Sequence, residues 1–492
     1  MPSTPNPPQP SPHDDAHANR IKWESFWVCV GVACLTILDL SKVNVGLPSI
    51  EDSLGGGATE LQLIVAGYAL AFGLALVPSG RLGDIRSRRR MFLIGLTSFT
   101  LASLLCAVAP TIEILVIGRI LQGVAAGIQM PQVLGLIQQL FRGRERGKAF
   151  GLFGAVIGLS TAFGPTLGGL LIAIGGEVDG WRLLFWMNIP LGLIAVYFAW
   201  RLLPKTQPHE GGAQTLDLIG IVLLGVATFS LMLPFVLTTG GPDDDPYRWF
   251  WLVVFAVASV GFVWWERRYL RMGKSPVVHF GLLRLSSYRN GILIGTTYFA
   301  AIPAMFLVVT LFLQRGLGLE AVFAGMVSIP FALASAVASW QGGRLVNEYG
   351  RKLVVLGLIL AVVGIGLCYP ITALAPVESM PWLLAGALTI AGAGGGLVIS
   401  PNQTLTLHDV PVTQGGVAGS VAQVGQRVGT AIGVAVASST FFATLYAEQA
   451  GGDPVAIHRD AIGRSLLIIV SFVLVGLLLS VLDLRKRRVE AA

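Results

Sequence analysis

A chain of 492 residues with 54% hydrophobic and only 12% charged residues is too apolar for an ordinary soluble protein, since soluble domains carry about 25% charged residues. The 61 glycines point the same way, because packed membrane helices use glycine for close approach. A formal net charge of +7 is compatible with nucleic-acid binding, but the positions of the basic residues argue against that class of partner.

Catalytic and metal-binding patterns are missing from the sequence. The four cysteines lie inside apolar runs without metal-ligand spacing, and the six histidines lie near the N-terminus or in predicted loops. We therefore expect buried thiols, no metal site and no cofactor. The sequence also lacks Gly-x-Ser-x-Gly, His-x-x-His and a phosphate-binding loop, so we predict that the protein is not an enzyme.

Long apolar stretches follow a polar N-terminal segment. Because residues 1–25 contain no apolar run and begin with many prolines, we expect a disordered tail there. The stretch Phe26–Val45 is too long for a cleaved signal sequence and predicts a retained membrane helix. A bilayer core of roughly 30 Å needs about 20 apolar residues per helix. The sequence thus predicts fourteen spans, near residues 26–47, 61–80, 91–109, 112–140, 149–175, 183–203, 217–238, 249–266, 291–314, 322–341, 353–375, 382–406, 418–446 and 464–484.

Basic residues alternate with the predicted spans. They gather in every second loop and after the last span, at Arg86–Arg90, Arg142–Lys148, Arg201 and Lys205, Arg267–Lys274, Arg344–Lys352 and Arg485–Arg488. Such an asymmetry obeys the positive-inside rule and predicts that both termini are cytoplasmic in a multi-pass protein of the cell membrane. The basic residues then face lipid headgroups of the bilayer, so we expect no nucleic-acid partner.

An internal repeat indicates the architecture. Gly80-Arg-Leu-Gly-Asp84 follows the second predicted span, and Gly343-Arg-Leu-Val-Asn347 follows the tenth, each with a basic pair four residues later. Two homologous helix sets separated by two extra spans are therefore predicted. We expect an all-α membrane protein with an N-terminal six-helix bundle over 26–203, two inserted helices with linkers over 204–290, a C-terminal six-helix bundle over 291–484 and a basic cytoplasmic tail over 485–492.

The loop Gly80–Arg89 resembles the signature that the major facilitator superfamily carries between its second and third helices, with Ile85 and Ser87 in place of the usual Arg and Gly. Four further segments are similar to the fourteen-helix drug:proton antiporter branch of that family, namely Leu38–Pro48, Arg119–Gly123, Gly154–Gly169 and Trp181–Pro190. The resemblance implies the major facilitator fold and a transporter that exchanges protons for its cargo.

The fifth predicted span carries a glycine-rich run with a central proline. Such a run permits tight packing and a bend, as it would in any helical bundle. In the family that the chain resembles, the Gly-Pro-x-x-Gly-Gly form is associated with antiporters rather than symporters, and it is the main reason to expect export. The residues concerned are Gly154, Gly158, Gly164, Pro165, Gly168 and Gly169.

Two charged residues are predicted deep in the first span. Asp39 lies about nine residues from the outer end, a depth of about 13 Å. A carboxylate there is costly unless paired or protonated, so Asp39 is either a proton carrier or part of a structural ion pair. Lys42, where the family usually has an apolar residue, lies on the same helical face and favours the ionised carboxylate. Lys42 therefore either locks Asp39 in a salt bridge or tunes its protonation.

Other deep polar residues suggest a proton and substrate route. Arg119 lies at about the depth of Asp39, so the two side chains are able to meet, and the resemblance links this arginine to proton transfer. We predict that Asp39 and Arg119 couple transport to protons. One deep acid against three deep bases favours anionic or zwitterionic cargo. The predicted substrate pathway consists of Lys42, Asn44, Gln122, Gln423, Gln426 and Arg427.

The two loops of the repeat are candidates for a gate. Asp84 beside several arginines is able to form a charge cluster against neighbouring helix ends and to latch one state of a transporter. The alternative is a basic loop that only sets the topology, but topology needs no carboxylate, and so we predict a gating role. The predicted gating residues are Gly80, Asp84, Arg88, Arg89, Gly343, Asn347 and Arg351.

These features together predict proton-driven export of a small amphipathic molecule or drug by alternating access. We expect a monomer that needs no cofactor and whose partners are protons, a small-molecule substrate and the bilayer. Two alternatives stay open at this point. One is a flippase for a lipid or cell-wall precursor, and the other is a metabolite uniporter or symporter on the same fold.

Overall fold

The computed structural model describes residues 12–55, 58–176, 178–205, 216–238, 244–274, 276–448 and 454–491, and within these ranges every regular element is helical. Thirteen helices are long and apolar enough to cross a membrane, and a bent pair, Gly143–Thr161 with Phe163–Gly175, raises the number to fourteen. An all-helical structure is expected in a membrane, because lipid offers no hydrogen-bond partners for backbone N–H and C=O groups and a helix pairs them internally. The predicted all-α membrane fold is confirmed.

The first half of the chain contains seven helices, α1 (Pro12–Leu54), α2 (Ala58–Ile85), α3 (Arg88–Ala107), α4 (Ile112–Leu140), α5 (Gly143–Gly175), α6 (Arg182–Trp186) and α7 (Asn188–Leu202). The middle contains α8 (Leu218–Val236), a 3-10 turn (Pro246–Phe250), α9 (Trp251–Arg271) and α10 (Gly281–Arg284). The second half contains α11 (Ser286–Leu311) with a π-helical turn (Phe312–Gly316), α12 (Ala321–Met326), α13 (Ile329–Tyr349), α14 (Arg351–Leu374), α15 (Met380–Thr406), a 3-10 turn (Val412–Gln414), α16 (Gly415–Glu448) and α17 (Pro454–Ala491).

Both chain ends differ from the sequence-based expectation. Helix α1 begins at Pro12, so the prediction of disorder over 1–25 is wrong for residues 12–25, while residues 1–11 lie outside the described part. That prediction depends on the prolines of the first eleven residues. The part of α1 before Phe26 is instead held by packing, since Trp23 lies edge-on against Phe141 with ring centroids 4.8 Å apart. Helix α17 likewise continues through the predicted basic tail as far as Ala491.

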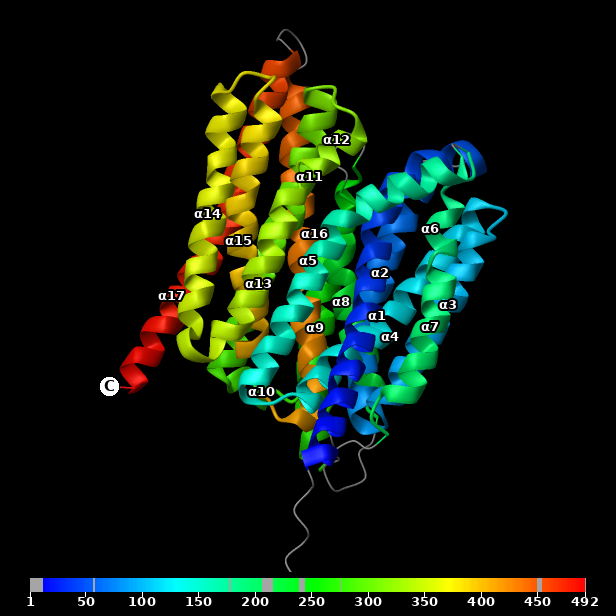
Figure 1. Ribbon diagram of the computed structural model, residues 1–492, viewed down its shortest axis with the longest axis vertical. Coiled ribbons are helices and arrows are strands. Elements are labelled where there is room, and N and C mark those ends of the chain that lie inside the picture. The colour runs from blue at the N-terminus through cyan, green and yellow to red at the C-terminus, as the bar shows by residue number, and fades with distance from the viewer. Residues whose placement is uncertain are drawn as a thin grey trace, which may run out of the picture.

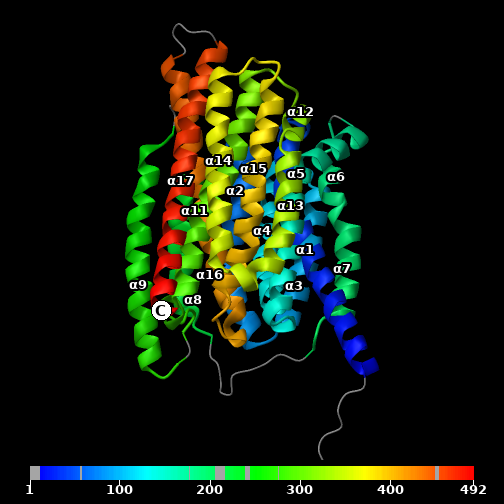
Figure 2. The same cartoon turned by 60° about the vertical axis from the view of Figure 1, so that its left-hand side comes forward.

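The two halves have largely separate hydrophobic cores. One cluster of buried side chains comes only from α11–α17 and the residues between them, and a second comes mainly from α1–α7. Figure 1 shows the same division, with α14 and α17 at one side of the molecule and α3 and α7 at the other. Helix α8 packs against α2 and α16, and α9 packs against α8. Figure 2 places α9 at the edge of the molecule.

The arginine-rich turns 86–90, 142–148 and 344–352 lie at one end of the bundle, which we call the basic end. At the turn between α2 and α3, Ser87 caps α3 by accepting a hydrogen bond from the backbone N–H of Arg90 at 3.3 Å. At the corresponding turn of the second half, Gly350 separates α13 from α14 with a φ of 51°, which only glycine adopts readily. The halves meet along α2 with α16 and along α5 with α13.

Candidate functional site

A cluster of buried polar side chains lies inside the first half, and we call it the charge network: Asp39 and Lys42 on α1, Arg119 and Gln122 on α4, and Asn188 on α7. All five have an exposed fraction of 0%. Oδ2 of Asp39 accepts a hydrogen bond from Nη1 of Arg119 at 2.6 Å, and its Oδ1 accepts one from Nδ2 of Asn188 at 2.7 Å. The structure thus brings the two predicted proton-coupling residues into direct contact.

Lys42 belongs to the same network. Its Nζ donates to Oδ1 of Asn188 at 2.7 Å and lies 3.4 Å from Oδ1 of Asp39. The three-residue spacing on α1 therefore places the ammonium and the carboxylate on one face, as the helical periodicity predicted. Asn188 bridges them, since it accepts from the lysine and donates to the aspartate.

Arg119 is held from several sides. Its Nε donates to the backbone oxygen of Ile64 at 3.1 Å, its Nη1 also donates to Oε1 of Gln122 at 2.7 Å, and its guanidinium lies 4.2 Å from the ring centroid of Tyr68. Nε2 of Gln122 in turn donates to Oγ of Ser103 at 2.7 Å. Lys42 and Gln122, predicted for the substrate pathway, are therefore enclosed in the first half and have no solvent contact in this conformation.

The glycine-rich run of α5 contacts both neighbours of that helix. A Cβ atom on Gly168 would lie 2.8 Å from the backbone oxygen of Lys42, and one on Gly164 would collide with Ser41, so these glycines let α5 press against α1 beside the charge network. Nearer the basic end, Gly154 and Gly158 face Ser339 and Ser335 of α13 in the second half. The part of α5 around Gly164 and Gly168 thus packs on α1, and the part around Gly154 and Gly158 packs on α13 of the second half.

The bend that the glycine-rich run with its proline permits is present in this helix. The two parts of α5, Gly143–Thr161 and Phe163–Gly175, meet at 44° close to Pro165. Proline removes one backbone hydrogen bond and so bends a helix at this place. Gly169 differs from its neighbours in the motif, because a Cβ atom there would meet no atom within 4 Å.

Asp84 connects the two halves at the basic end. Its carboxylate, which is buried, accepts hydrogen bonds from the backbone N–H groups of Gly416 at 3.0 Å and Val417 at 2.9 Å, at the start of α16. It also accepts from Nη2 of Arg88 at 2.6 Å. A helix N-terminus is a favourable place for a carboxylate, because its first N–H groups lack helical partners. Gly80 allows the close approach, since a Cβ atom there would lie 2.7 Å from the oxygen of Gly416.

The second copy of the repeat is built differently. Gly343 does pack between the halves, because a Cβ atom on Gly147 of α5 would lie 2.6 Å from its oxygen. Arg351 binds within its own half, to Oδ2 of Asp483 at 2.7 Å and Oδ1 of Asn402 at 2.6 Å. Asn347, which occupies the place of Asp84 in the repeat, is exposed.

Arg89 also bonds inside its own half, since its guanidinium donates to the backbone oxygen of Trp200 on α7. Of the seven predicted gating residues, Gly80, Asp84, Arg88 and Gly343 therefore contact the opposite half, with Arg88 donating to the backbone oxygen of Val412. The exposed side chain of Asn347 also lies beside Gly147 of α5, but it makes no hydrogen bond there with any described residue. Arg89 and Arg351 tie helices together within one half.

The predicted pathway residues of the second half lie on α16. The guanidinium of Arg427 is half-buried and stands 4.5 Å from the ring centroid of Phe72 on α2, and it makes no hydrogen bond or ion pair with any described residue. Gln423 is buried and Gln426 half-buried on the same helix. Asn44 is exposed on α1 and is not brought to this group.

Sequence reasoning missed Asn188 and Gln138 as site residues. Asn188 lies inside Trp181–Pro190, a segment that supports the family resemblance. Nothing in the sequence indicates that this neutral amide contacts Asp39. Gln138 on α4 donates from Nε2 to the backbone oxygen of Val410 in the second half at 3.0 Å, and so adds to the contact at the basic end. The sequence signal for these contacts is the run of five glutamines on one membrane helix, Gln122, Gln129, Gln132, Gln138 and Gln139.

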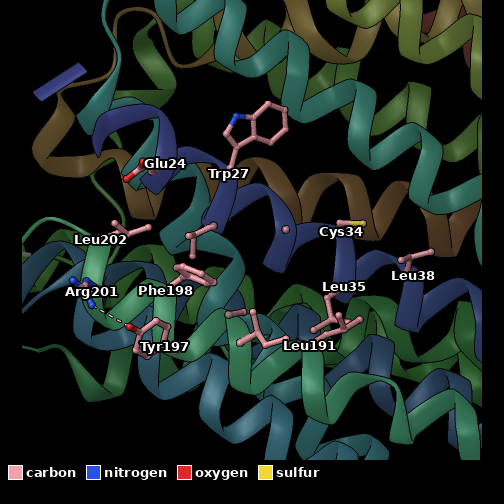
Figure 3. A pocket seen from close by; sticks show the side chains of 14 residues that line it. Glu24, Trp27, Cys34, Leu35, Leu38, Leu191, Tyr197, Phe198, Arg201 and Leu202 are labelled. Carbon is pink, nitrogen blue, oxygen red and sulfur yellow. Dashed lines mark hydrogen bonds between the residues drawn. The ribbon is translucent and has the colours of Figure 1, made fainter. Parts of the chain in front are cut away.

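A groove of about 770 Å³ lies between α1 and α7, and its lining ends at Leu38 on α1 and begins at Leu191 on α7, next to the charge network along both helices. Figure 3 shows its apolar wall, with Trp27, Leu35 and Phe198, and its polar end, where Arg201 donates to the hydroxyl of Tyr197 at 3.0 Å. The five residues of the charge network are absent from its lining.

The described residues contain up to fourteen candidate spans, twelve of them in two halves that join at one end and the first half holding ionisable side chains away from solvent. These are the features of a secondary transporter. Comparison with known proteins gives the family. The model of the Major Facilitator Superfamily matches residues 29–434, and the chain belongs to that superfamily of membrane transporters.

Two curated relatives are named as a transporter and as a multidrug resistance protein. The chain is 34% identical to the probable actinorhodin transporter of Streptomyces coelicolor, over 86% of this chain and 73% of that protein. It is 32% identical to the multidrug resistance protein Stp of Mycobacterium tuberculosis, over 86% and 78%. The crystal structure of the human organic anion transporter MFSD10 superposes with a TM-score of 0.67 at 15% identity and covers 93% of this chain and 99% of that one, which supports the fold alone.

Proposed function

We propose that the protein is a proton-coupled antiporter that exports a small amphipathic molecule across the cytoplasmic membrane, as a monomer and without a cofactor. The observation that carries the proposal is the charge network, in which Asp39 is held between Arg119, Lys42 and Asn188 without solvent contact. Ionisable groups are costly inside a membrane protein, so a linked set of them indicates a proton pathway more readily than a structural brace.

The proposed orientation places the basic end and both termini in the cytoplasm, as the positive-inside rule requires. In this structure the two halves are joined at that end by Asp84 and the start of α16. The conformation is then closed toward the cytoplasm. Export requires this contact to break so that cargo can enter from the cytoplasm, and to form again after the cargo has bound.

The cargo that fits the described residues best is an anionic or zwitterionic molecule with an apolar body. Among the described residues Arg427 makes no hydrogen bond or ion pair, whereas Lys42 and Arg119 share the carboxylate of Asp39. The ring of Phe72 beside Arg427 offers an apolar surface next to the charge. The names of the relatives, an actinorhodin transporter and a multidrug resistance protein, support an exported organic molecule as cargo.

The test uses everted membrane vesicles from cells that produce the full chain. Respiration acidifies the vesicle interior, and a fluorescent indicator reports the pH gradient while actinorhodin is added as a probe. An antiporter should dissipate the gradient when a probe is added, and vesicles with Asp39→Asn should not.

Other outcomes would contradict the proposal. A gradient that stays constant while lipid-linked precursors change leaflet would favour a flippase. Probe uptake into intact cells together with protons would favour a symporter, and probe movement that ignores the pH gradient would favour a uniporter. Equal dissipation in vesicles with and without the chain would also count against antiport.

A further inference from the structure

The charge network holds one carboxylate and two potential cations. Asp39, Lys42 and Arg119 are all fully buried. One carboxylate balances one cation, so a protonated Lys42 leaves an excess positive charge inside the first half, which is unfavourable in a medium of low dielectric. Arg119 does not lose its proton under any ordinary condition. Loss of a proton from Lys42 leaves the balanced pair of Asp39 and Arg119.

The hydrogen bonds indicate which of the two groups, the carboxylate of Asp39 or the amine of Lys42, exchanges a proton. Each oxygen of Asp39 already faces an N–H donor, Arg119 on Oδ2 at 2.6 Å and Asn188 on Oδ1 at 2.7 Å. A hydrogen bond to an ionised acceptor is stronger than one to a neutral acceptor, so a proton on either oxygen would weaken the bonds that Arg119 and Asn188 donate. The carboxylate is therefore held in its ionised form.

Lys42 has no such obstacle. Two acceptors face its Nζ, Oδ1 of Asn188 at 2.7 Å and Oδ1 of Asp39 at 3.4 Å. An ammonium group has three hydrogens and a neutral amine has two, so the amine keeps both contacts after it has lost a proton. The network is therefore compatible with both protonation states of Lys42 without a change in its contacts.

The helices around Lys42 contribute few other titratable groups. Besides Asp39 on its own helix, α2 contributes Tyr68, α3 contributes Cys106 and α4 contributes Arg119. Helix α5 contributes the backbone at Gly164 and Gly168, and α7 contributes the neutral amide of Asn188.

We propose that Lys42 is the residue that releases and rebinds the coupling proton, and that Asp39 and Arg119 are the pair that positions it. This inference rests on the proposed antiport and names the group that performs it. In the step, an Nζ–H bond breaks when the network opens to water, the electron pair stays on the nitrogen and the proton passes to water. The reverse step on the other side of the membrane restores the ammonium.

The test uses the full chain in lipid nanodiscs, with protons as the only ligand. Lysine labelled with ¹³C at Cε gives a resonance that moves when the amine loses its proton, and the Lys42 resonance is identified by its loss in Lys42→Met. Spin labels at the exposed residues Arg86 and His408 report the distance between the halves at the basic end. Both signals are followed from weakly acidic to weakly alkaline pH.

In the wild-type protein, the Lys42 resonance and the distance between the halves should change over the same pH range. Lys42→Met and Lys42→Arg should both lose the pH-dependent change in distance, the first because it has no proton to release and the second because it cannot release one. Methionine leaves the Asp39–Arg119 pair balanced, so its fold is expected to hold, and arginine keeps the positive charge.

A distance that still responds to pH in Lys42→Met as it does in the wild type would overturn the role of Lys42 and leave the antiport proposal standing. A Lys42 resonance that stays fixed while the distance moves would do the same. A wild-type protein in which neither signal responds to pH would contradict proton coupling itself, and the inference with it.

Discussion

Replacement of Asp84 by asparagine tests the contact that joins the halves. The carboxylate accepts two backbone hydrogen bonds across the halves, from Gly416 at 3.0 Å and Val417 at 2.9 Å, whereas its bond with Arg88 stays within the first half. The amide oxygen of asparagine is able to keep one of the two, so the variant loses about one hydrogen bond to a charged group, worth about 1.5–3 kcal/mol. The ratio of closed to open molecules at the basic end should fall by about 10- to 150-fold.

Spin labels at Arg86 and His408 measure that ratio directly as the populations of short and long distances. Asn347→Ala is the matched control, because Asn347 has the same place in the repeat but is exposed, and it should change the ratio less than about twofold. Arg89→Ala should also have a smaller effect than Asp84→Asn, since Arg89 binds α7 of its own half. A distance distribution in Asp84→Asn that matches the wild type would refute the latch.

Three further changes test the remaining sites. Asp39→Asn should still insert into the membrane but lose stability and proton-coupled transport, because two buried cations then lack a carboxylate. Full activity of this variant in energised vesicles would remove Asp39 from the mechanism. Gly168→Ala should lower the free energy of unfolding by about 1–3 kcal/mol, because the new methyl group meets the backbone of Lys42. Thermal unfolding and transport assays should show this loss, and Gly169→Ala, at a position with open space, should not show it. A cysteine at the exposed Val257 of α9 should react with a lipid-soluble maleimide equally with and without cargo, and protection by cargo would place α9 on the pathway.

The sequence was sufficient for the membrane fold because lipid imposes strong constraints on it. Each span has to be long and apolar, and the basic loops alternate, so hydropathy and charge together predicted the fourteen candidate spans. The contact of Asp39 with Arg119 followed from their similar depth, since two charges at one level of a bundle are each other's cheapest partners.

Depth along a helix says nothing about which way a side chain points across the bundle. Lys42 and Gln122 were therefore assigned to the substrate pathway, although both point into the closed interior of the first half. Arg351 was assigned to the gate by the repeat, but its partner Asp483 lies 132 residues later in a helix that the sequence marked only as apolar. Such long-range pairings depend on tertiary packing, which no local pattern records.

Proton-coupled export is tested most directly with purified protein in proteoliposomes and an imposed pH gradient that can be reversed. Antiport predicts that the probe accumulates on the side with the higher proton concentration, by up to about tenfold for each proton and each pH unit, and that reversal of the gradient reverses the accumulation. Lys42→Met should show no accumulation in either direction. Accumulation of the probe on the side with the lower proton concentration, or equal probe on both sides under either gradient, would contradict proton-driven export.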